Sequence, residues 1–128
     1  MLSVKKKKSL KIVYILACWL IGEVFHHWLS FGGIVVKNYG ISFGINGWFW
    51  IVLNIFFVAF LTIIWFKNTL LSIGLVVAGG WINLIDRIIF GYVRDYWQLG
   101  WFYNNLADWL IQAGIIIYLL RVWIKKSK

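Results

Sequence analysis

The sequence is poor in cysteine, in acidic residues and in charge as a whole, and it contains no proline. Its single cysteine, Cys18, excludes an intramolecular disulfide and a metal site built on several cysteines. Only 13% of the 128 residues are charged, whereas 62% are hydrophobic. A water-soluble domain of this length could not bury so many apolar side chains, because small domains have a large surface for their volume. The composition therefore predicts a single domain embedded in lipid.

Four apolar stretches are long enough to cross a bilayer, which requires about 20 mainly apolar residues in one helix. Each stretch is apolar around its whole circumference, as is typical of a helix in lipid, so no strands are expected within them. Lysines before the first stretch also resemble the start of a secretory signal, but the apolar run continues and three more spans follow, which favours a retained first span. The sequence therefore predicts an all-α membrane protein, a bundle of four transmembrane helices at about 10–29, 48–66, 70–90 and 106–124.

Basic residues dominate the charge, and the formal net charge is +9. A surface for nucleic acid would gather basic residues on one face of an element, whereas these flank apolar runs, so no nucleic-acid partner is expected. Cytoplasmic loops of membrane proteins carry an excess of Lys and Arg. We therefore expect a multi-pass protein of the bacterial cytoplasmic (inner) membrane, with both termini in the cytoplasm and the connections 27–47 and 91–105 on the outer face. Ten of the 13 Lys and Arg residues are expected on the cytoplasmic side: Lys5, Lys6, Lys7, Lys8, Lys11, Lys67, Arg121, Lys125, Lys126 and Lys128.

All the carboxylates are predicted to lie in the outer half of a span or in an outer connection. Ionisable side chains at membrane depth are costly, so each is a candidate functional residue. Two have a structural alternative: Asn105 and Asp108 have the spacing of an N-terminal helix cap, and Asp95 next to Arg94 resembles an ordinary loop acid. The four carboxylates are Glu23, Asp86, Asp95 and Asp108.

Other polar residues in the spans are expected to hold helices together. Asp86 and Arg87 are adjacent, so they do not face each other on a helix, and we expect them to end the third span or to tie it to other helices. Glu23, Asn83 and His27 could be interhelical hydrogen-bond partners. His26 and His27 are adjacent and point in different directions, so no metal site is expected there. No cofactor is predicted.

Asp95 and Asp108 together suggest a specific chemistry. If the second outer connection folds back on the bundle, the two carboxylates can meet near the membrane surface. Two carboxylates a few ångströms apart do not both ionise readily, so one keeps a proton. The ionised partner can then take a proton from water, while the protonated partner donates to a substrate carbonyl. This is the acid–base work of an aspartic peptidase. The spacing permits such a pair without requiring it.

Three segments resemble the motifs of the signal peptidase II family, the lipoprotein signal peptidases. The segment 83–95, NLIDRIIFGYVRD, resembles the signature N-x-x-D-R-x3-G-x-V-x-D. The segment 103–108, YNNLAD, resembles the F-N-x-A-D motif, and the segment 37–43, KNYGISF, is similar to R-N-x-G-A-A-F. The motifs occur in family order, on a four-span frame that covers essentially the whole chain. The chain thus resembles a short, divergent member.

This resemblance implies a membrane-embedded aspartyl endopeptidase. Such enzymes remove the signal peptide from prolipoproteins, cutting before a cysteine that carries a diacylglyceryl group. The aspartates that match Asp95 and Asp108 form the catalytic pair of the family. Prolipoproteins and membrane lipid are the implied partners, and a monomer is expected because one bundle holds the whole site. The implied fold adds a small β-cradle on the outer face, built from the first outer connection.

The resemblance also assigns supporting residues around the pair. One group supports the aspartates or holds the substrate backbone, and the other is structural. The first group is Asn38, Asn83, Arg87 and Asn105, and the second is Asp86, Gly91 and Gly40.

The chain departs from the family pattern in several places. Glu23 and His27 stand where the first helix of the family usually has Asp and Lys. Tyr103 replaces a Phe, and Asn104 is inserted after it. Trp109 replaces the small hydroxyl residue that normally follows the second aspartate. The stretch between the two aspartates is short and lacks the customary proline, which bears on the fit of the substrate.

Two other functions are compatible with parts of the sequence. A four-span, proton-coupled small multidrug transporter would use Glu23, although this residue is nearer the outer half than the midplane, where transporter sites lie. That function leaves Asp95 and Asp108 without a role. A non-catalytic homologue that binds prolipoproteins without cutting them is suggested by Trp109 and the short outer connection.

Overall fold

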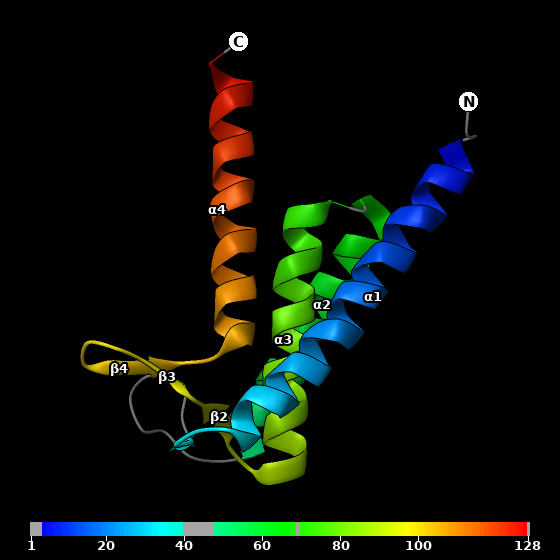
Figure 1. Ribbon diagram of the computed structural model, residues 1–128. Coiled ribbons are helices and arrows are strands. Elements are labelled where there is room, and N and C mark those ends of the chain that lie inside the picture. The colour runs from blue at the N-terminus through cyan, green and yellow to red at the C-terminus, as the bar shows by residue number, and fades with distance from the viewer. Residues whose placement is uncertain (1–3, 40–47, 69, 128) are drawn as a thin grey trace.

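The computed structural model describes residues 4–39, 48–68 and 70–127. Four long helices form its frame: α1 (Val4–Phe31), α2 (Trp48–Asn68), α3 (Leu71–Phe90) and α4 (Leu106–Lys126). Each is long and apolar enough to cross a membrane. The start of α1 and the end of α4 lie at one end of the bundle, and the strands lie at the other (Figure 1). The predicted four-helix membrane bundle is confirmed.

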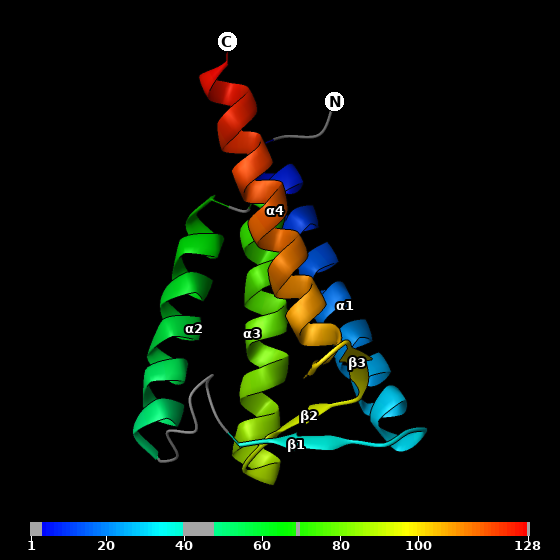
Figure 2. The same ribbon diagram turned by 90° about the vertical axis from the view of Figure 1, so that its left-hand side faces the viewer.

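The central helix of the bundle is α3. It packs against each of the other three helices and is the most buried of the four spans, and Figure 2 shows α1 and α2 on opposite sides of it. The helix ends at Gly91, which adopts the left-handed conformation with φ 78° and donates its N–H to the carbonyl of Arg87 at 3.1 Å. Glycine reaches this conformation without steric cost. The turn leads the chain directly into the strands that follow.

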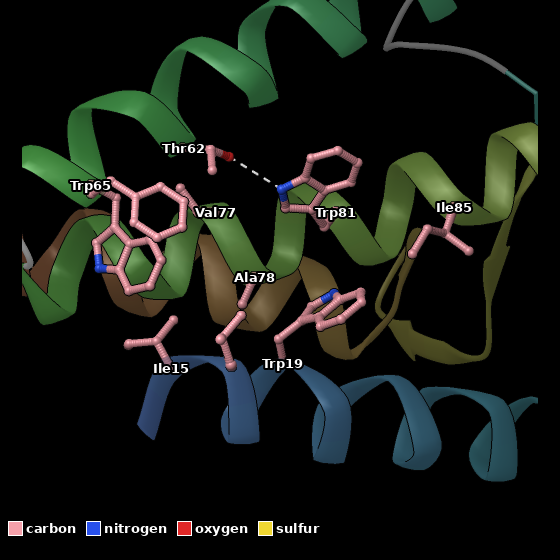
Figure 3. A pocket seen from close by; sticks show the side chains of 10 residues that line it. Ile15, Trp19, Thr62, Trp65, Val77, Ala78, Trp81 and Ile85 are labelled. Carbon is pink, nitrogen blue, oxygen red and sulfur yellow. Dashed lines mark hydrogen bonds between the residues drawn. The ribbon is translucent and has the colours of Figure 1, made fainter. Parts of the chain in front are cut away.

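A tryptophan-lined cavity of about 290 Å³ lies between α1, α2 and α3 (Figure 3). Trp65 of α2 is buried beside it and packs with Ile15 and Val77. Trp81 of α3 donates its indole N–H to the hydroxyl oxygen of Thr62 on α2 at 3.1 Å. Lipid cannot accept this hydrogen bond, so the contact between the two side chains holds α2 against α3.

The helices α3 and α4 approach each other closely at two buried glycines. A Cβ atom at Gly79 would collide with the carbonyl oxygen of Ala107, and one at Gly114 would lie 2.5 Å from the carbonyl oxygen of Ser72. Small residues at such positions let the backbones of membrane helices come together. The contact at Gly79 lies directly before Asp108 in α4, so it also determines the position of that side chain.

We expect Gly79→Ala to lower the free energy of unfolding by about 1–3 kcal/mol, because the added methyl group would press on the backbone carbonyl of Ala107, which cannot turn away as a side chain can. Gly80→Ala is the matched control. Its Cβ atom would lie 3.1 Å from a methyl group of Val58, which is the end of a side chain and can move. Unfolding in mixed micelles with increasing SDS measures both variants. If Gly79→Ala loses no more unfolding free energy than Gly80→Ala, the close approach of α3 and α4 at Gly79 is not required for stability.

In the described residues, four short strands lie at the end of the bundle away from the start of α1 and the end of α4. β1 (Val36–Asn38) pairs antiparallel with β2 (Val93–Asp95), and β3 (Trp97–Leu99) pairs antiparallel with β4 (Phe102–Asn104). The small β-structure implied by the family resemblance is therefore present, as two two-stranded sheets. The resemblance placed it in the first outer connection, whereas β2, β3 and β4 come from the second. The rest of the first connection, residues 40–47, lies outside the described residues, and so does Gly40.

Candidate active site

Asp95 and Asp108 lie at the end of the bundle that carries the strands. Asp95 is the last residue of β2 and is only 2% exposed. Asp108 is in the first turn of α4 and is partly buried. The charge of Asp108 acts on the carboxyl group of Asp95. The short connection through β3 and β4 thus folds back and brings the start of α4 to the end of β2.

Asn105 joins the two carboxylates. Its side-chain N–H donates to Asp95 at 2.8 Å and also to the side-chain oxygen of Asn83 at 3.2 Å. Its side-chain oxygen accepts the backbone N–H of Asp108 at 3.1 Å, while its own backbone N–H donates to the Asp108 carboxylate at 3.2 Å. These last two bonds form a capping box at the start of α4. The helix-cap alternative for Asn105 and Asp108 is therefore confirmed, and it coexists with the contact to Asp95.

Two further amides complete the set of donors. Asn38 at the end of β1 donates to the second oxygen of Asp95 at 3.0 Å. Asn83 on α3 donates to Asp108 at 2.9 Å. Both oxygens of each carboxyl group therefore accept an N–H, which fixes the orientation of both groups. Three asparagines from three separate motifs converge on one pair of aspartates.

Burial dominates the electrostatics of Asp95. It raises the pKa of this carboxyl above the ordinary value, the hydrogen bonds from Asn38 and Asn105 oppose the rise, and the charge of Asp108 adds to it. The guanidinium group of Arg87 donates to the backbone carbonyl of Asn83 at 3.3 Å, and its charge acts on both aspartates. Arg87 is thus the positive charge beside the pair.

Asp86 lies outside this cluster, in a buried ion pair with Arg94. One carboxylate oxygen is 2.6 Å from the guanidinium group, and the other accepts the backbone N–H of Arg94 at 3.0 Å. Asp86 is fully buried. The pair ties the last turn of α3 to β2, directly before Asp95. The residue thus joins α3 to other elements, which was one of the two alternatives that the sequence left open for it.

His26, His27 and Tyr96 also contribute to this region, and sequence reasoning gave them no role near the pair. His26 is fully buried and contacts Asp86 at 2.9 Å, and His27 accepts a hydrogen bond from Arg94 at 3.1 Å. Adjacent residues do point in different directions on a helix, yet both histidines reach the same ion pair, His26 through Asp86 and His27 through Arg94. In the sequence, these residues could be recognised only as polar side chains expected at a similar depth in the membrane, because no spacing rule connects them.

Trp109, the bulky departure after Asp108, borders a cleft beside the site. Its side chain is 43% exposed. The cleft is open and mainly apolar, and it is lined by Leu106 and Trp109 of α4 together with Tyr96, Trp97, Gln98 and Leu99. An apolar group of a ligand could therefore lie against the first turn of α4, next to Asp108.

The pair of carboxyl groups is arranged for acid–base chemistry. A carboxyl group with a raised pKa keeps its proton at a pH where its neighbour is ionised. The protonated group can donate to an oxygen that gains charge, and the ionised group can accept a proton from water. Fixed amide donors hold both groups in place for such transfers.

Comparisons with known proteins agree with this geometry. The family model described as signal peptidase (SPase) II matches residues 6–124. A lipoprotein signal peptidase of Halothermothrix orenii is 37% identical over 113 residues, which cover 81% of this chain and 74% of the relative. One of Sinorhizobium fredii is 35% identical over 94 residues, covering 60% of this chain and 55% of the relative. One of Thermodesulfovibrio yellowstonii is 32% identical over 99 residues, covering 69% and 67%.

The fold is also similar to solved structures. Two bacterial membrane enzymes superpose with TM-scores of 0.75 and 0.70, at 21% and 19% sequence identity, over 91% and 89% of this chain and 91% and 92% of theirs. The chain spans 55 to 74% of the length of the three relatives named above. The match of the family model along almost the whole chain, together with these relatives, shows that this protein belongs to the signal peptidase II family.

Proposed function

We propose that the protein is an aspartyl endopeptidase that removes the signal peptide from diacylglyceryl-modified prolipoproteins, cutting before the lipidated cysteine. The observation that carries this proposal is the contact of Asn105 with both aspartates. A helix cap alone would need Asn105 and Asp108 only. The additional bond to Asp95, from a different element, builds a pair of carboxyl groups with defined orientation.

The two carboxyl groups take different roles in the proposed reaction. Asp95 is the more buried group, and its pKa is raised, so it keeps the proton and donates it to the carbonyl oxygen of the scissile bond. Asp108 is left to act as the base that takes a proton from the attacking water. The positive charge of Arg87 limits the repulsion between the pair when both are ionised. Asn38 and Asn83 hold the carboxyl groups in position.

The substrate would approach from the membrane. The open apolar cleft at Leu106 and Trp109 adjoins Asp108 and suits the lipid-bearing part of a prolipoprotein. The excess of basic residues at the opposite end of the bundle supports cytoplasmic termini and a site at the outer face of the inner membrane. One chain supplies a donor to both oxygens of each aspartate, so the proposed site does not require a second copy.

The test is cleavage of a synthetic prolipoprotein by the purified chain in lipid nanodiscs, followed by mass spectrometry. We expect a product that begins with the diacylglyceryl cysteine. The same precursor without the diacylglyceryl group is the control and should be cut far more slowly. Binding of the precursor by folded protein without any cleavage would support the non-catalytic homologue instead. A drug-resistance phenotype that depends on Glu23, in the absence of cleavage, would support the transporter.

The pH dependence of cleavage should reflect the state of Asp95. At low pH both carboxyl groups are protonated and no base is present, and at high pH Asp95 loses its proton and no acid is present. The raised pKa of Asp95 in the free protein therefore moves the alkaline limb of the kcat/KM profile above the ordinary range of aspartate.

Asn38→Ala should move this alkaline limb further up, by about one pH unit. The variant removes an N–H that stabilises the charged form of Asp95, and a hydrogen bond to a charged group is worth enough for such a shift. Tyr39→Phe, at the exposed neighbouring position, is the control and should leave the profile in place. A limb that stays in place or moves down in Asn38→Ala would contradict the assignment of the proton to Asp95.

A further inference from the structure

His26 lies at the centre of a buried chain of hydrogen bonds that the proposed chemistry does not use. It is fully buried near the end of α1. One ring nitrogen, Nδ1, is 3.0 Å from the hydroxyl oxygen of Tyr96, and the other, Nε2, is 2.9 Å from the carboxylate of Asp86. The ring therefore connects the residue that follows Asp95 with the last turn of α3.

One arm of this chain leads to the start of α4. The hydroxyl oxygen of Tyr96 accepts the backbone N–H of Leu106 at 3.0 Å. Leu106 is the first residue of α4, and the N–H groups of a first turn have no acceptor within the helix. Tyr96 thus supplies one of these acceptors, two residues before Asp108. It fixes where the helix begins with respect to β2.

The other arm leads to β2. Asp86 accepts the N–H of His26, the backbone N–H of Arg94 and the guanidinium group of Arg94. Arg94 directly precedes Asp95 in the strand. A single ring on α1 thereby joins the strand that carries one aspartate to the helix that carries the other.

One arrangement of the protons satisfies both side chains of the chain. Tyr96 accepts from Leu106, so its own proton can be donated to Nδ1 of His26. Nε2 then carries the ring proton and donates it to Asp86. Burial raises the pKa of Tyr96 to about 12, so the phenol remains protonated at neutral pH. Each polar atom of both side chains is then satisfied.

We propose that His26 and Tyr96 are positioning residues that set the placement of Asp108 relative to Asp95. The proposal rests on the proposed peptidase function, in which both aspartates must act on one water and one carbonyl group. Reactive groups that are displaced by about 1 Å can lose roughly 100-fold in rate, even when the altered residue is remote from the chemistry. Neither residue needs to touch the substrate for this effect.

The test is a set of substitutions that remove or mimic these hydrogen bonds. Tyr96→Phe and His26→Leu should each lower kcat by roughly 10- to 100-fold and leave KM within about twofold of wild type. His26→Gln should recover a large part of the loss, because an amide can both accept from Tyr96 and donate to Asp86. Tyr118→Phe, on the exposed face of α4, is the matched control and should keep wild-type kinetics.

The double variant His26→Leu/Tyr96→Phe tests whether the two residues act as one unit. We expect its kcat to be no lower than that of the worse single variant, because either change already breaks the chain. Rates are normalised to the folded fraction, measured by size-exclusion chromatography and thermal unfolding in detergent. If His26→Leu does not fold, Tyr96→Phe and His26→Gln carry the comparison.

The outcomes separate this inference from the function on which it rests. Failure of the wild-type chain to cut a lipidated precursor overturns both. Normal cleavage by wild type, together with wild-type kcat in Tyr96→Phe and no difference between His26→Gln and His26→Leu, overturns only the positioning role. Loss of folded protein at unchanged kcat would likewise assign the chain of hydrogen bonds to stability alone.

Discussion

Under the proposed function, Asp108→Asn and Asp95→Asn should each lower kcat for prolipoprotein cleavage by roughly 100- to 10,000-fold, which is the range lost when a general acid or base is removed. An amide in place of the Asp108 carboxylate could not take a proton from water, and an amide in place of the Asp95 carboxyl could not supply the acidic proton to a carbonyl oxygen. Each variant keeps one of the two oxygen acceptors and replaces the other with an NH2 group, so one surrounding N–H donor loses its acceptor and the folded fraction must be measured. Single-turnover cleavage of the lipidated precursor, with folded protein measured in parallel, gives the rates.

Glu23→Gln is the matched control for both variants, because it makes the same change from carboxylate to amide in the same end of the bundle. Glu23 is half-buried on α1, and its charge acts on the neighbouring group of His26, Asp86 and Arg94. The proposed reaction gives it no proton to transfer, so kcat should stay within a few-fold of wild type. Undiminished cleavage by either aspartate variant would exclude the proposed pair. A loss of kcat in Glu23→Gln as large as in the two aspartate variants would indicate that the catalytic carboxylate lies on α1.

Asp86→Ala should lower the free energy of unfolding by about 3–5 kcal/mol, which is the usual cost of removing one partner of a buried ion pair. Arg94 would keep its charge in a buried position and lose its carboxylate acceptor. His26 would lose a hydrogen bond as well. SDS-induced unfolding in mixed micelles measures the loss. A decrease of less than about 1 kcal/mol would show that water or lipid headgroups replace the carboxylate.

Asp86→Leu/Arg94→Met should restore a large part of this stability, because replacing both partners of a buried pair with apolar residues removes the unpaired charge. Arg121→Ala is the control for removal of a basic residue. Its side chain is exposed near the end of α4, so its effect should stay within about 0.5 kcal/mol. If the double variant is as unstable as Asp86→Ala, the loss of stability comes from the missing hydrogen bonds to β2 and not from the unpaired charge of Arg94.

The helical frame could be predicted from the sequence because lipid imposes a simple requirement. A run of about 20 apolar residues has few alternatives to a spanning helix, since every backbone group must be satisfied within the segment. The short strands offered no comparable signal. A strand of three residues, such as β3, is too short for an alternation of apolar and polar residues to be recognised.

The candidate site could be predicted only in part. The spacing of Asn105 and Asp108 indicated a helix cap, and the structure contains that cap. The proximity of Asp95 depends on how the connection between β2 and α4 folds, which local spacing does not determine. The role of His26 was hidden for the same reason, because its partners Tyr96 and Asp86 are 70 and 60 residues away in the chain.

Asn105 caps α4 and also holds Asp95, and this links the order of synthesis to the appearance of activity. Asp95 leaves the ribosome before Asn105 and Asp108. A nascent chain that has inserted only its first three helices therefore carries one aspartate of the pair, while the second aspartate of the pair and the residue that bridges them are not yet in place. Under the proposed function, such an intermediate is inactive towards precursors that cross the membrane beside it. Docking of the last helix is then the step at which the protein matures.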